Sequence, residues 1–325
     1  MFKIRGRTLL VTAGLALAMG IAGAETSYPD KPIRFIVGYA PGGGTDLIAR
    51  VVGNELAQAW DATVVVENRP GAGSNIATRE VARAAPDGYT LLVTSTPFAI
   101  NPSLYKNAGY HPLEDFVPVF NAGHSATLLV VPPEVSANNL EELIALGDSE
   151  PLSYASAGVG TVPFFTAEYL LKHKAGMEIE HVPYGGAGPA LVAVVAGHVP
   201  VGMLALATPG LEKWITSGKL KALALSNAKR VDSLPDVPTV SESGFPDYVD
   251  LTWIAFAAPA GTPMEIVEKL NQEMNRILEK PSVRAEFAAI GFDWEPNTAS
   301  EFADFVAAES SRWTEIVDTI GLEIN

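Results

Sequence analysis

The sequence predicts an α/β protein with two lobes that face one cleft. Short apolar runs of strand length alternate with segments in which apolar residues recur every three or four positions, and this alternation is typical of a parallel sheet with helical crossovers. Twice the chain passes from an apolar run through a glycine loop into a helical pattern, at residues 33–50 and 152–171. Because these stretches are roughly 110 residues apart, we expect one in each lobe, on opposite sides of one ligand.

The first glycine loop follows a strand expected at 33–37 and opens a helix. Three consecutive glycines at 42–44 allow positive φ and let backbone amides point inward, next to the unpaired amides of the helix start. A helix N-terminus carries roughly half a positive charge, so the loop predicts a carboxylate or phosphate site without any basic side chain. A plain strand-to-helix turn capped by Thr45 or Asp46 explains the same residues.

The second glycine loop repeats this design. Ser156, Gly158, Gly160 and Thr161 lie between an apolar run that starts at residue 152 and a helical pattern that continues to about Lys174. Two loops of this kind in one chain indicate a shared ligand more specifically than either loop does alone.

Two more turns are expected at the same edge of their sheets. Residues 185–189 are glycine-rich, follow a strand expected at 179–184 and open another helix. Ser95 and Thr96 follow the strand expected at 91–94. Ligands of parallel sheets lie beyond the carboxyl ends of the strands, so both turns are candidates for the ligand site.

The remaining elements continue the alternation and then become helical. Further strands are expected at 63–67, 128–131, 199–206, 220–226 and 249–258, with helices at 74–84, 138–147 and 208–217. Thr262 with Glu265, and Thr298 with Glu301, have the spacing of capping boxes that start two C-terminal helices. Apolar residues after the second box recur at helical steps, so we expect that helix to lie with one face against a lobe.

The composition is that of a globular protein with an acidic surface. Of the 325 residues, 48% are hydrophobic, which suffices for a substantial core and about two domains. The formal net charge is −15 at pH 7, so nucleic acid and anionic lipid are poor partners. There is no cysteine, which excludes a disulfide framework and a thiolate metal site.

Residues 1–24 have the three parts of a secretory signal peptide. Three basic residues within the first seven positions precede an uncharged apolar run at 8–23 and a small-residue end at Ala24. The run is short for a membrane span, and an uncleaved N-terminal anchor is the alternative. Cleavage removes three positive charges, so the formal charge becomes −15 − 3 = −18, and we expect the mature protein in the periplasm.

No catalytic or metal-binding motif accompanies the loops. The five histidines have no metal-ligand spacing, and the HExxH, GxSxG, GxxxxGK[ST] and GxGxxG patterns are absent. Ser156 has no obvious base, and the loops supply only glycine, serine and threonine. Such groups hold a ligand and do not transform it, so we expect a binding protein without cofactor or metal, not an enzyme.

Six segments spread over the mature chain carry a specific resemblance. They are YPDKPIRFIVGYAPGGGTD at 28–46, VENRPGAGSNIA at 66–77, APDGYTLL at 85–92, VPYGGAGPAL at 182–191, SGKLKALALSNAKR at 217–230 and LPDVPTVSESGFPDY at 234–248. In these segments the sequence resembles the Bug family, the extracytoplasmic solute receptors of tripartite tricarboxylate transporters. The resemblance implies a two-lobed periplasmic-binding-protein fold of type II, with lobe 1 at 25–125 and 250–325 and lobe 2 at 126–249.

The resemblance also implies a carboxylate site in the cleft. Its first-lobe side would comprise Tyr39, Gly42, Gly43 and Thr45, with Ser95 and Thr96 beside them. Its second-lobe side would comprise Ser156, Gly158 and Thr161, with Tyr184, Gly185 and Ala187 lining the distal end. The loop patterns alone indicate the same two main loops.

The sequence departs from the family pattern near the distal end. Many relatives have a Gly-Gln-Val-Asp run that continues to a Phe-Asp pair, whereas this chain has Gly197–Pro200 followed by Met203 and Leu204. An ammonium group buried there would be unpaired at a cost of several kcal/mol. Leu204 therefore predicts a carboxylate or dicarboxylate ligand without an amine, although ordinary core packing of this leucine is an equal alternative.

Three functions are compatible with these observations. In the leading one, a monomer captures a small carboxylate and delivers it to the permease subunits of a tripartite tricarboxylate transporter. The others are a periplasmic ligand sensor without its own permease and a secreted hydrolase on a similar fold. A titration with a panel of carboxylates separates the two receptors from the hydrolase, because only the hydrolase would convert its ligand.

Overall fold

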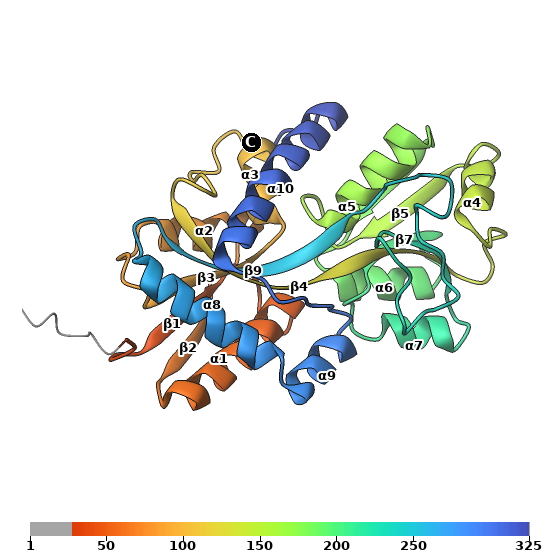
Figure 1. The fold of residues 1–325 in the computed structure, drawn as a ribbon. Coiled ribbons are helices and arrows are strands. Elements are labelled where there is room, and N and C mark those ends of the chain that lie inside the picture. The colour runs from red at the N-terminus through yellow and green to blue at the C-terminus, as the bar shows by residue number, and fades with distance from the viewer. Residues whose placement is uncertain (1–27, 325) are drawn as a thin grey trace, which may run out of the picture.

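The computed structural model describes residues 28–324, so the leader expected at 1–24 lies outside the described residues. The strands of this range form one connected sheet in the order β2-β1-β3-β9-β4-β7-β5-β6, with β8 beside β4. Helices cover the sheet on both sides, and two lobes lie side by side along it (Figure 1). No helix within 28–324 is long and apolar enough to cross a membrane.

The first lobe is built around parallel strands with helical crossovers, as the alternation in the sequence predicts. β1 pairs in parallel with both β2 and β3, which places the ends of β1 and β3 at the same sheet edge. Its elements are β1 (Ile33–Val37), α1 (Gly44–Trp60), β2 (Val64–Asn68), η1 (Ala72–Ser74), α2 (Asn75–Ala82), β3 (Thr90–Ser95) and α3 (Pro97–Leu104).

Two long strands run from one lobe into the other. β4 (Phe116–Val131) and β9 (Leu251–Pro259) are antiparallel to each other, and β9 lies between β3 and β4. From Thr127 onward β4 leaves β9 and pairs with β7 and β8 instead. The separate strand expected at 128–131 is therefore the second half of β4. The two register shifts on its first half, around Pro118 and Gly123, bend the strand without ending it.

The second lobe has the same plan of strands and covering helices. β5 pairs in parallel with β6 and β7, so the second and third glycine loops leave neighbouring strands at one edge. Its elements are α4 (Leu140–Gly147), β5 (Leu152–Ser156), α5 (Val162–Thr166), the π-helix η2 (Ala167–Lys174), β6 (Ile179–Pro183), α6 (Ala187–Val195), β7 (Val201–Ala205), α7 (Leu211–Thr216) and β8 (Lys221–Leu225).

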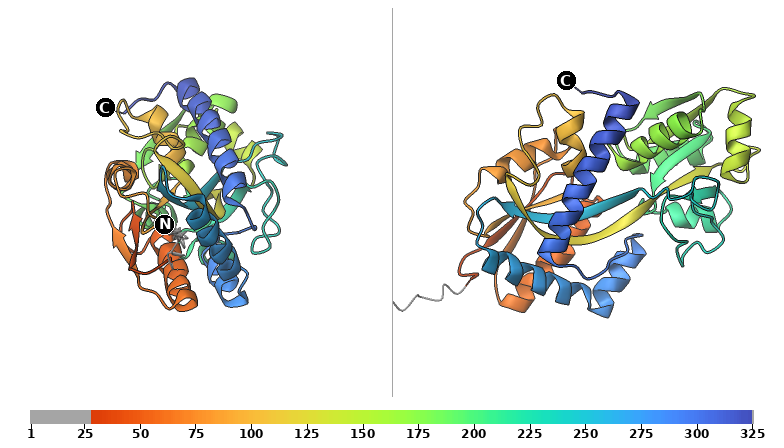
Figure 2. Two further views of the ribbon diagram at one scale, coloured as in Figure 1. Left: turned by 60° about the vertical axis from the view of Figure 1, so that its left-hand side comes forward. Right: turned by 45° about the horizontal axis from the view of Figure 1, so that its top comes forward.

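The C-terminal helices return to the first lobe, and the last of them crosses the waist between the lobes. They are α8 (Met264–Leu278), α9 (Pro281–Ala289) and α10 (Ala299–Ile320). α10 packs on α3 and β4, and the right-hand view of Figure 2 shows it lying across the two long strands. Its Trp313 ring also contacts Phe165 of α5, with ring centroids 5.3 Å apart, so α10 touches both lobes.

Only one of the two expected capping boxes is present. The side chain of Thr298 accepts a hydrogen bond from the Glu301 amide, and the Glu301 carboxylate accepts one from the Thr298 amide. The box expected at Thr262 is wrong, because its hydroxyl donates to the Pro259 carbonyl over 2.8 Å and Pro263 occupies the N-cap position of α8.

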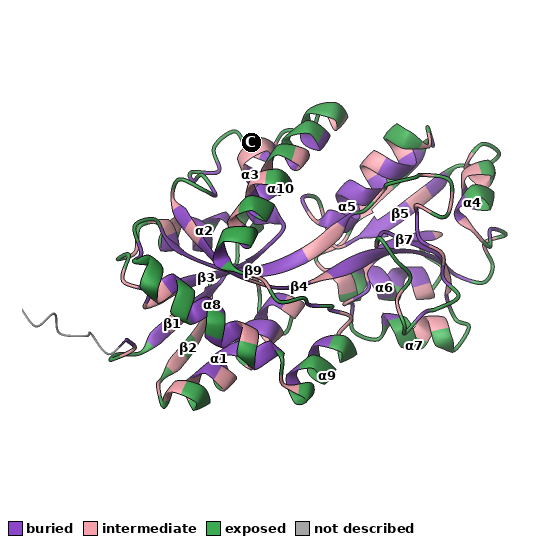
Figure 3. Cartoon of the chain, viewed as in Figure 1, coloured by how far each residue is buried: buried purple, intermediate pink, exposed green. Residues whose placement is uncertain are grey.

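The core consists of three clusters that separate by face of the sheet. One cluster lies under α1 and α8, and another lies under α6 and α7. The largest lies under α2, α3, α5 and α10 and is continuous from the first lobe into the second, through Trp253 and Trp313. Figure 3 shows the buried strands as a band through both lobes, with exposed residues on the outer helix faces.

Candidate functional site

A cavity of about 160 Å³ lies where the three glycine loops meet. From the first lobe and β9 it is lined by Tyr39, Thr45, Ser95, Pro97 and Thr252; from the second lobe it is lined by Ala157, Thr161, Val162, Pro163, Ala187, Met203, Leu204 and Ala205. None of these lining residues is charged. Three larger hollows of the described chain, of about 450, 660 and 310 Å³, lie beside η2, beside α4 and between β4 and the start of α10, away from the glycine loops.

The first loop is shaped mainly by one glycine. Gly42 has φ +86°, a left-handed value that favours glycine, whereas Gly43 is extended and Gly44 begins α1. Gly43 is the N-cap residue and no side chain caps the helix, so Thr45 and Asp46 are not the N-cap. The amides of Gly44 and Thr45 belong to the first turn of α1 and have no helical acceptor.

A buried carboxylate occupies part of the expected anion cradle. Asp46 is 2% exposed, and its Oδ2 accepts the Gly42 amide over 2.9 Å. Arg50 contacts the carboxylate as well, and Asn68 donates to Oδ1 over 2.9 Å. Burial by itself raises the pKa of Asp46, but the bonds from Arg50, Gly42 and Asn68 outweigh burial and hold that pKa below its usual value. The Gly42 amide is therefore bonded within the loop, which leaves the amides at the start of α1 for a ligand.

The second loop is held by a serine–histidine contact that the sequence did not reveal. Ser156 is fully buried, its Oγ lies 2.8 Å from His181 Nε2, and the Gly158 amide donates to the same Oγ over 3.1 Å. The expectation that Ser156 has no base is thus wrong. Burial lowers the pKa of His181, so the imidazole is neutral near pH 7. Ser156 itself lies outside the cavity lining, and the contact fixes the loop.

Thr161 is the N-cap residue of α5 and lines the cavity. Its Oγ1 donates to the Gly158 carbonyl over 2.7 Å, which closes the loop. Gly158 and Gly160 have φ of +119° and +87°, so the left-handed conformations of this loop fall on glycines. Gly158 lies behind the cavity wall, near the Tyr184 carbonyl.

Of the other predicted site residues, some line the cavity and some lie behind its lining and hold it in place. Ser95 and Ala187 line the cavity, whereas Thr96 is fully buried and its Oγ1 accepts the Trp253 amide over 3.0 Å. Gly43, Tyr184 and Gly185 are outside the lining; the Tyr184 amide donates to the Ser156 carbonyl over 3.1 Å and joins the third loop to the second.

The distal wall is apolar. Met203 and Leu204 lie on β7, are 1% exposed each and line the cavity together with Ala205. Leu204 therefore contributes both to the core and to the cavity. On the opposite wall, the hydroxyls of Tyr39 and Thr252 are buried without a hydrogen-bond partner. Buried polar atoms are nearly always paired. The hydroxyls of Thr94, Ser95 and Ser74 lie near that of Tyr39, so the Thr252 hydroxyl is the one with free bonding capacity on this wall.

Comparison with known proteins identifies the family of this chain. The sequence profile of the tripartite tricarboxylate transporter family receptors, TctC, matches residues 48–322. The chain belongs to this family. The receptor is 36% identical to the protein BugT of Bordetella pertussis, over 97% of this chain and 96% of that protein.

Solved structures of two proteins have the same fold as this receptor. Rpa4515 of R. palustris, solved with adipate, has a TM-score of 0.82 at 30% identity and covers 91% of this chain and 99% of its own. MatC of Rhodopseudomonas palustris, solved with malate, has a TM-score of 0.78 at 32% identity and covers 89% of this chain and all of its own. The mixed α/β periplasmic-binding-protein fold expected from the sequence is thus confirmed, and the family is one of solute-binding receptors rather than enzymes.

Proposed function

We propose that this receptor holds a small carboxylate in the cavity between the glycine loops and delivers it to the permease of a tripartite tricarboxylate transporter. The observation that carries the proposal is that Thr45, in the first turn of α1, and Thr161, at the start of α5, line one cavity from opposite lobes. A ligand held from both sides stabilises the arrangement in which the two walls meet.

The chemistry of the wall supports an anion held by dipoles. First-turn amides and hydroxyls can donate to a carboxylate, and the cavity has no cationic side chain that would require a strongly charged ligand. Asp46 places a negative charge beside α1, but Asp46 is outside the cavity lining and its charge is offset by the ion pair with Arg50. We propose that the ligand contacts Tyr39, Thr45, Ser95, Thr161, Ala187 and Leu204, while Gly42, Gly43, Thr96, Ser156, Gly158, Tyr184 and Gly185 shape the loops around it.

We further propose that the ligand carries no amine and has an apolar body. Met203, Leu204 and Ala205 offer no partner to an ammonium group, and an unpaired buried charge costs several kcal/mol. Adipate and malate, which are bound in the two solved relatives, are both carboxylates without an amine.

The remaining parts of the proposal concern location and organisation. The three-part pattern at residues 1–24 supports export and cleavage near Glu25, with the monomer acting in the periplasm. The change of β4 partners at Thr127 supports a division into lobe 1 at 25–125 and 250–325 and lobe 2 at 126–249.

Isothermal titration of the purified receptor at pH 7.5 tests the ligand class. The panel pairs adipate, malate, succinate and glutarate with the amino acids aspartate and glutamate. We expect at least one amine-free acid to bind, and each amino acid to bind at least tenfold more weakly than its deaminated analogue. An amino acid that binds more tightly than its deaminated analogue would overturn the claim that the ligand carries no amine. Chemical conversion of any acid of the panel would overturn the proposal that the protein acts only as a receptor.

A further inference from the structure

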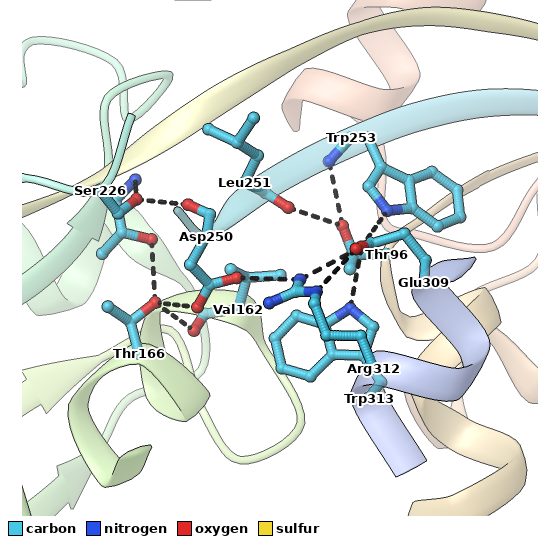
Figure 4. A network of polar contacts seen from close by, with 11 residues as sticks. Thr96, Val162, Thr166, Ser226, Asp250, Leu251, Trp253, Glu309, Arg312 and Trp313 are labelled. Atoms are coloured by element: carbon cyan, nitrogen blue, oxygen red, sulfur yellow. Dashed lines mark hydrogen bonds and ion pairs between the residues drawn. The ribbon is translucent and has the colours of Figure 1, made fainter. Parts of the chain in front are cut away.

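A buried polar network lies at the waist of the molecule, on the side of α10 (Figure 4). Asp250, the residue before β9, is 3% exposed and stands at its centre. Its Oδ2 accepts the Thr166 hydroxyl over 2.7 Å, and its Oδ1 lies 3.4 Å from Nη2 of Arg312. Its backbone is fixed to Ser226, whose carbonyl accepts the Asp250 amide over 3.0 Å and whose hydroxyl donates to the Asp250 carbonyl.

The α10 side of the network is rigid. Glu309 Oε2 accepts both indole N–H groups, from Trp253 and Trp313, over 3.0 Å each. Glu309 Oε1 accepts Nε of Arg312 over 2.8 Å, so the guanidinium is held in a fixed orientation toward Asp250. The charged end of α10 is therefore preorganised for the Asp250 carboxylate.

The α5 side of the network leads to the ligand cavity. The Thr166 hydroxyl has one proton and three acceptors within reach, the Asp250 carboxylate at 2.7 Å, the Val162 carbonyl at 2.9 Å and the Thr127 hydroxyl at 3.4 Å. A charged acceptor makes the stronger bond, so an ionised Asp250 takes this proton. Val162 lines the cavity and follows Thr161. On the other side, Trp253 donates its amide to Thr96, which adjoins the cavity residue Ser95.

We propose that Asp250 is a positioning residue for the ligand cavity, whose ionised carboxylate ties α5 to α10 and whose protonation releases that tie. The inference deepens the proposed function, because it concerns the element that carries the second-lobe wall. When Asp250 is neutral, the Thr166 hydroxyl donates to the Val162 carbonyl of its own helix instead. Arg312 then keeps its ion pair with Glu309 of α10 but loses the one with Asp250. The two lobes are then joined at this point only by apolar contacts and by the shared strands.

The groups around Asp250 determine the pH at which its carboxylate takes up a proton. Burial raises the pKa of Asp250 to about 6, opposed by Arg312 and by the Thr166 bond, while the nearby Glu309 raises it further. Tyr248 also faces the carboxylate and has a pKa raised well above 10 by burial, and Arg312 remains charged. Tyr169 of η2 lies beside Tyr248. The tie is therefore present above pH 6 and lost below it.

Release of the tie is distinct from acid unfolding. Because the pKa of Asp250 is raised in the folded protein, the folded state binds a proton as the pH falls through about 6, whereas the unfolded chain does so only near 4. This residue alone thus stabilises the fold as the pH falls from 7 to 5, while the connection between α5 and α10 weakens. Protonation of Asp250 should therefore be recognised by two results together: the distance between the lobes becomes more variable at pH 5, and the melting temperature does not fall because of this residue.

The test uses ligand-free protein and two readouts. Lys213→Cys in α7 and Glu268→Cys in α8 add exposed thiols to a chain that has no cysteine, so spin labels report the distance between the lobes. Tryptophan fluorescence reports Trp253 and Trp313 once the other three tryptophans, Trp60, Trp214 and Trp294, are replaced by phenylalanine in the background used for this readout. From pH 8 to 5 we expect both readouts to change with a midpoint near pH 6, and the distance distribution to shift to longer values.

Matched variants assign the transition. Asp250→Asn should abolish it and show the low-pH distances at pH 7.5, whereas Thr166→Val should show those distances at every pH while fluorescence still titrates. Glu242→Gln, at an exposed ion pair with Arg230, and His181→Gln should keep the wild-type transition. A transition retained in Asp250→Asn, or none in the wild type, would overturn the inference. Neither result depends on whether any carboxylate binds.

Discussion

The first glycine loop has a buried carboxylate at its helix start, whereas the second has only hydroxyls and an imidazole. In the first loop Asp46 takes the Gly42 amide and is anchored by Arg50 and Asn68. In the second loop Ser156 is held by His181, and Thr161 closes the turn on Gly158. The glycine pattern is similar in both, so it indicates the shape of a loop and not which groups its amides bind.

Removal of the Asp46 carboxylate should have the largest effect. Asp46→Ala leaves the Gly42 amide and the Asn68 side chain without their acceptor, and hydrogen bonds to a buried charge are worth about 1.5 to 3 kcal/mol each. We expect the free energy of unfolding to fall by about 3 kcal/mol in urea denaturation. Asp304→Ala, at an exposed position of α10, serves as control and should change it by less than about 0.5 kcal/mol.

Acid should reproduce this loss. The pKa of Asp46 is lowered in the folded state, so its stabilisation is fully present above the ordinary value near 4 and is lost as the pH falls through the lowered value. A wild type and Asp46→Ala with parallel stability profiles between pH 5 and 2 would contradict the assigned role of this carboxylate.

Substitution of Thr161 should affect ligand binding more than stability. Thr161→Val keeps the shape of the side chain and removes the hydroxyl from the cavity wall. A bound carboxylate is a stronger acceptor than the Gly158 carbonyl to which this hydroxyl donates in the ligand-free structure. One hydrogen bond to a charged group corresponds to roughly tenfold to a hundredfold in affinity. Titration with the tightest-binding acid of the panel measures the change. An unchanged affinity would place the carboxylate elsewhere in the cavity.

Substitution of Ser156 should affect stability more than ligand binding. Ser156→Ala leaves His181 and the Gly158 amide without a buried partner, which costs about 1 to 2 kcal/mol of folding free energy. Because Ser156 lies behind the cavity wall, we expect a smaller loss of affinity than for Thr161→Val, seen by titration under the same conditions. A larger loss would mean that the hydroxyl reaches the ligand.

The smallest expected effect concerns the support of the first loop. Ser74 has φ +79° and a buried hydroxyl without a partner, and a Cβ on Gly38 would come within 1.8 Å of its Oγ. The second loop has its left-handed residues at glycines. Ser74→Gly should therefore relieve strain and raise the free energy of unfolding by about 1 kcal/mol, measured as a higher melting temperature. A lower melting temperature would show that the hydroxyl is bonded in solution.

The sequence predicted what depends on local pattern. Apolar runs followed by glycine loops located β1, β5 and β6 and the turns after them, because burial and the absence of a Cβ act on neighbours in the chain. The cavity lining includes Thr45, Thr161 and Leu204, which the motifs had indicated. The continuity of β4 was missed because its middle, 121–125, is small and polar and does not look like a buried strand.

The missed contacts all join residues that are far apart in the sequence. Asn68 follows Asp46 by 22 positions and His181 follows Ser156 by 25. Asp250 gathers partners from α5, from the end of β8 and from α10, and none of these elements carries a motif that points to the others. Such contacts follow from the packing of the sheet and become visible only in three dimensions.

The position of β9 between β3 and β4 has a consequence for the synthesis of the protein. The strand that completes the middle of the first lobe begins at Leu251, so the lobe has two unpaired strand edges until most of the chain has been made. Unpaired edges delay stable folding and invite pairing with other chains. Until its last quarter has been made, the nascent chain therefore stays unfolded enough to be exported and depends on chaperones. Any fragment that ends before residue 251 should aggregate.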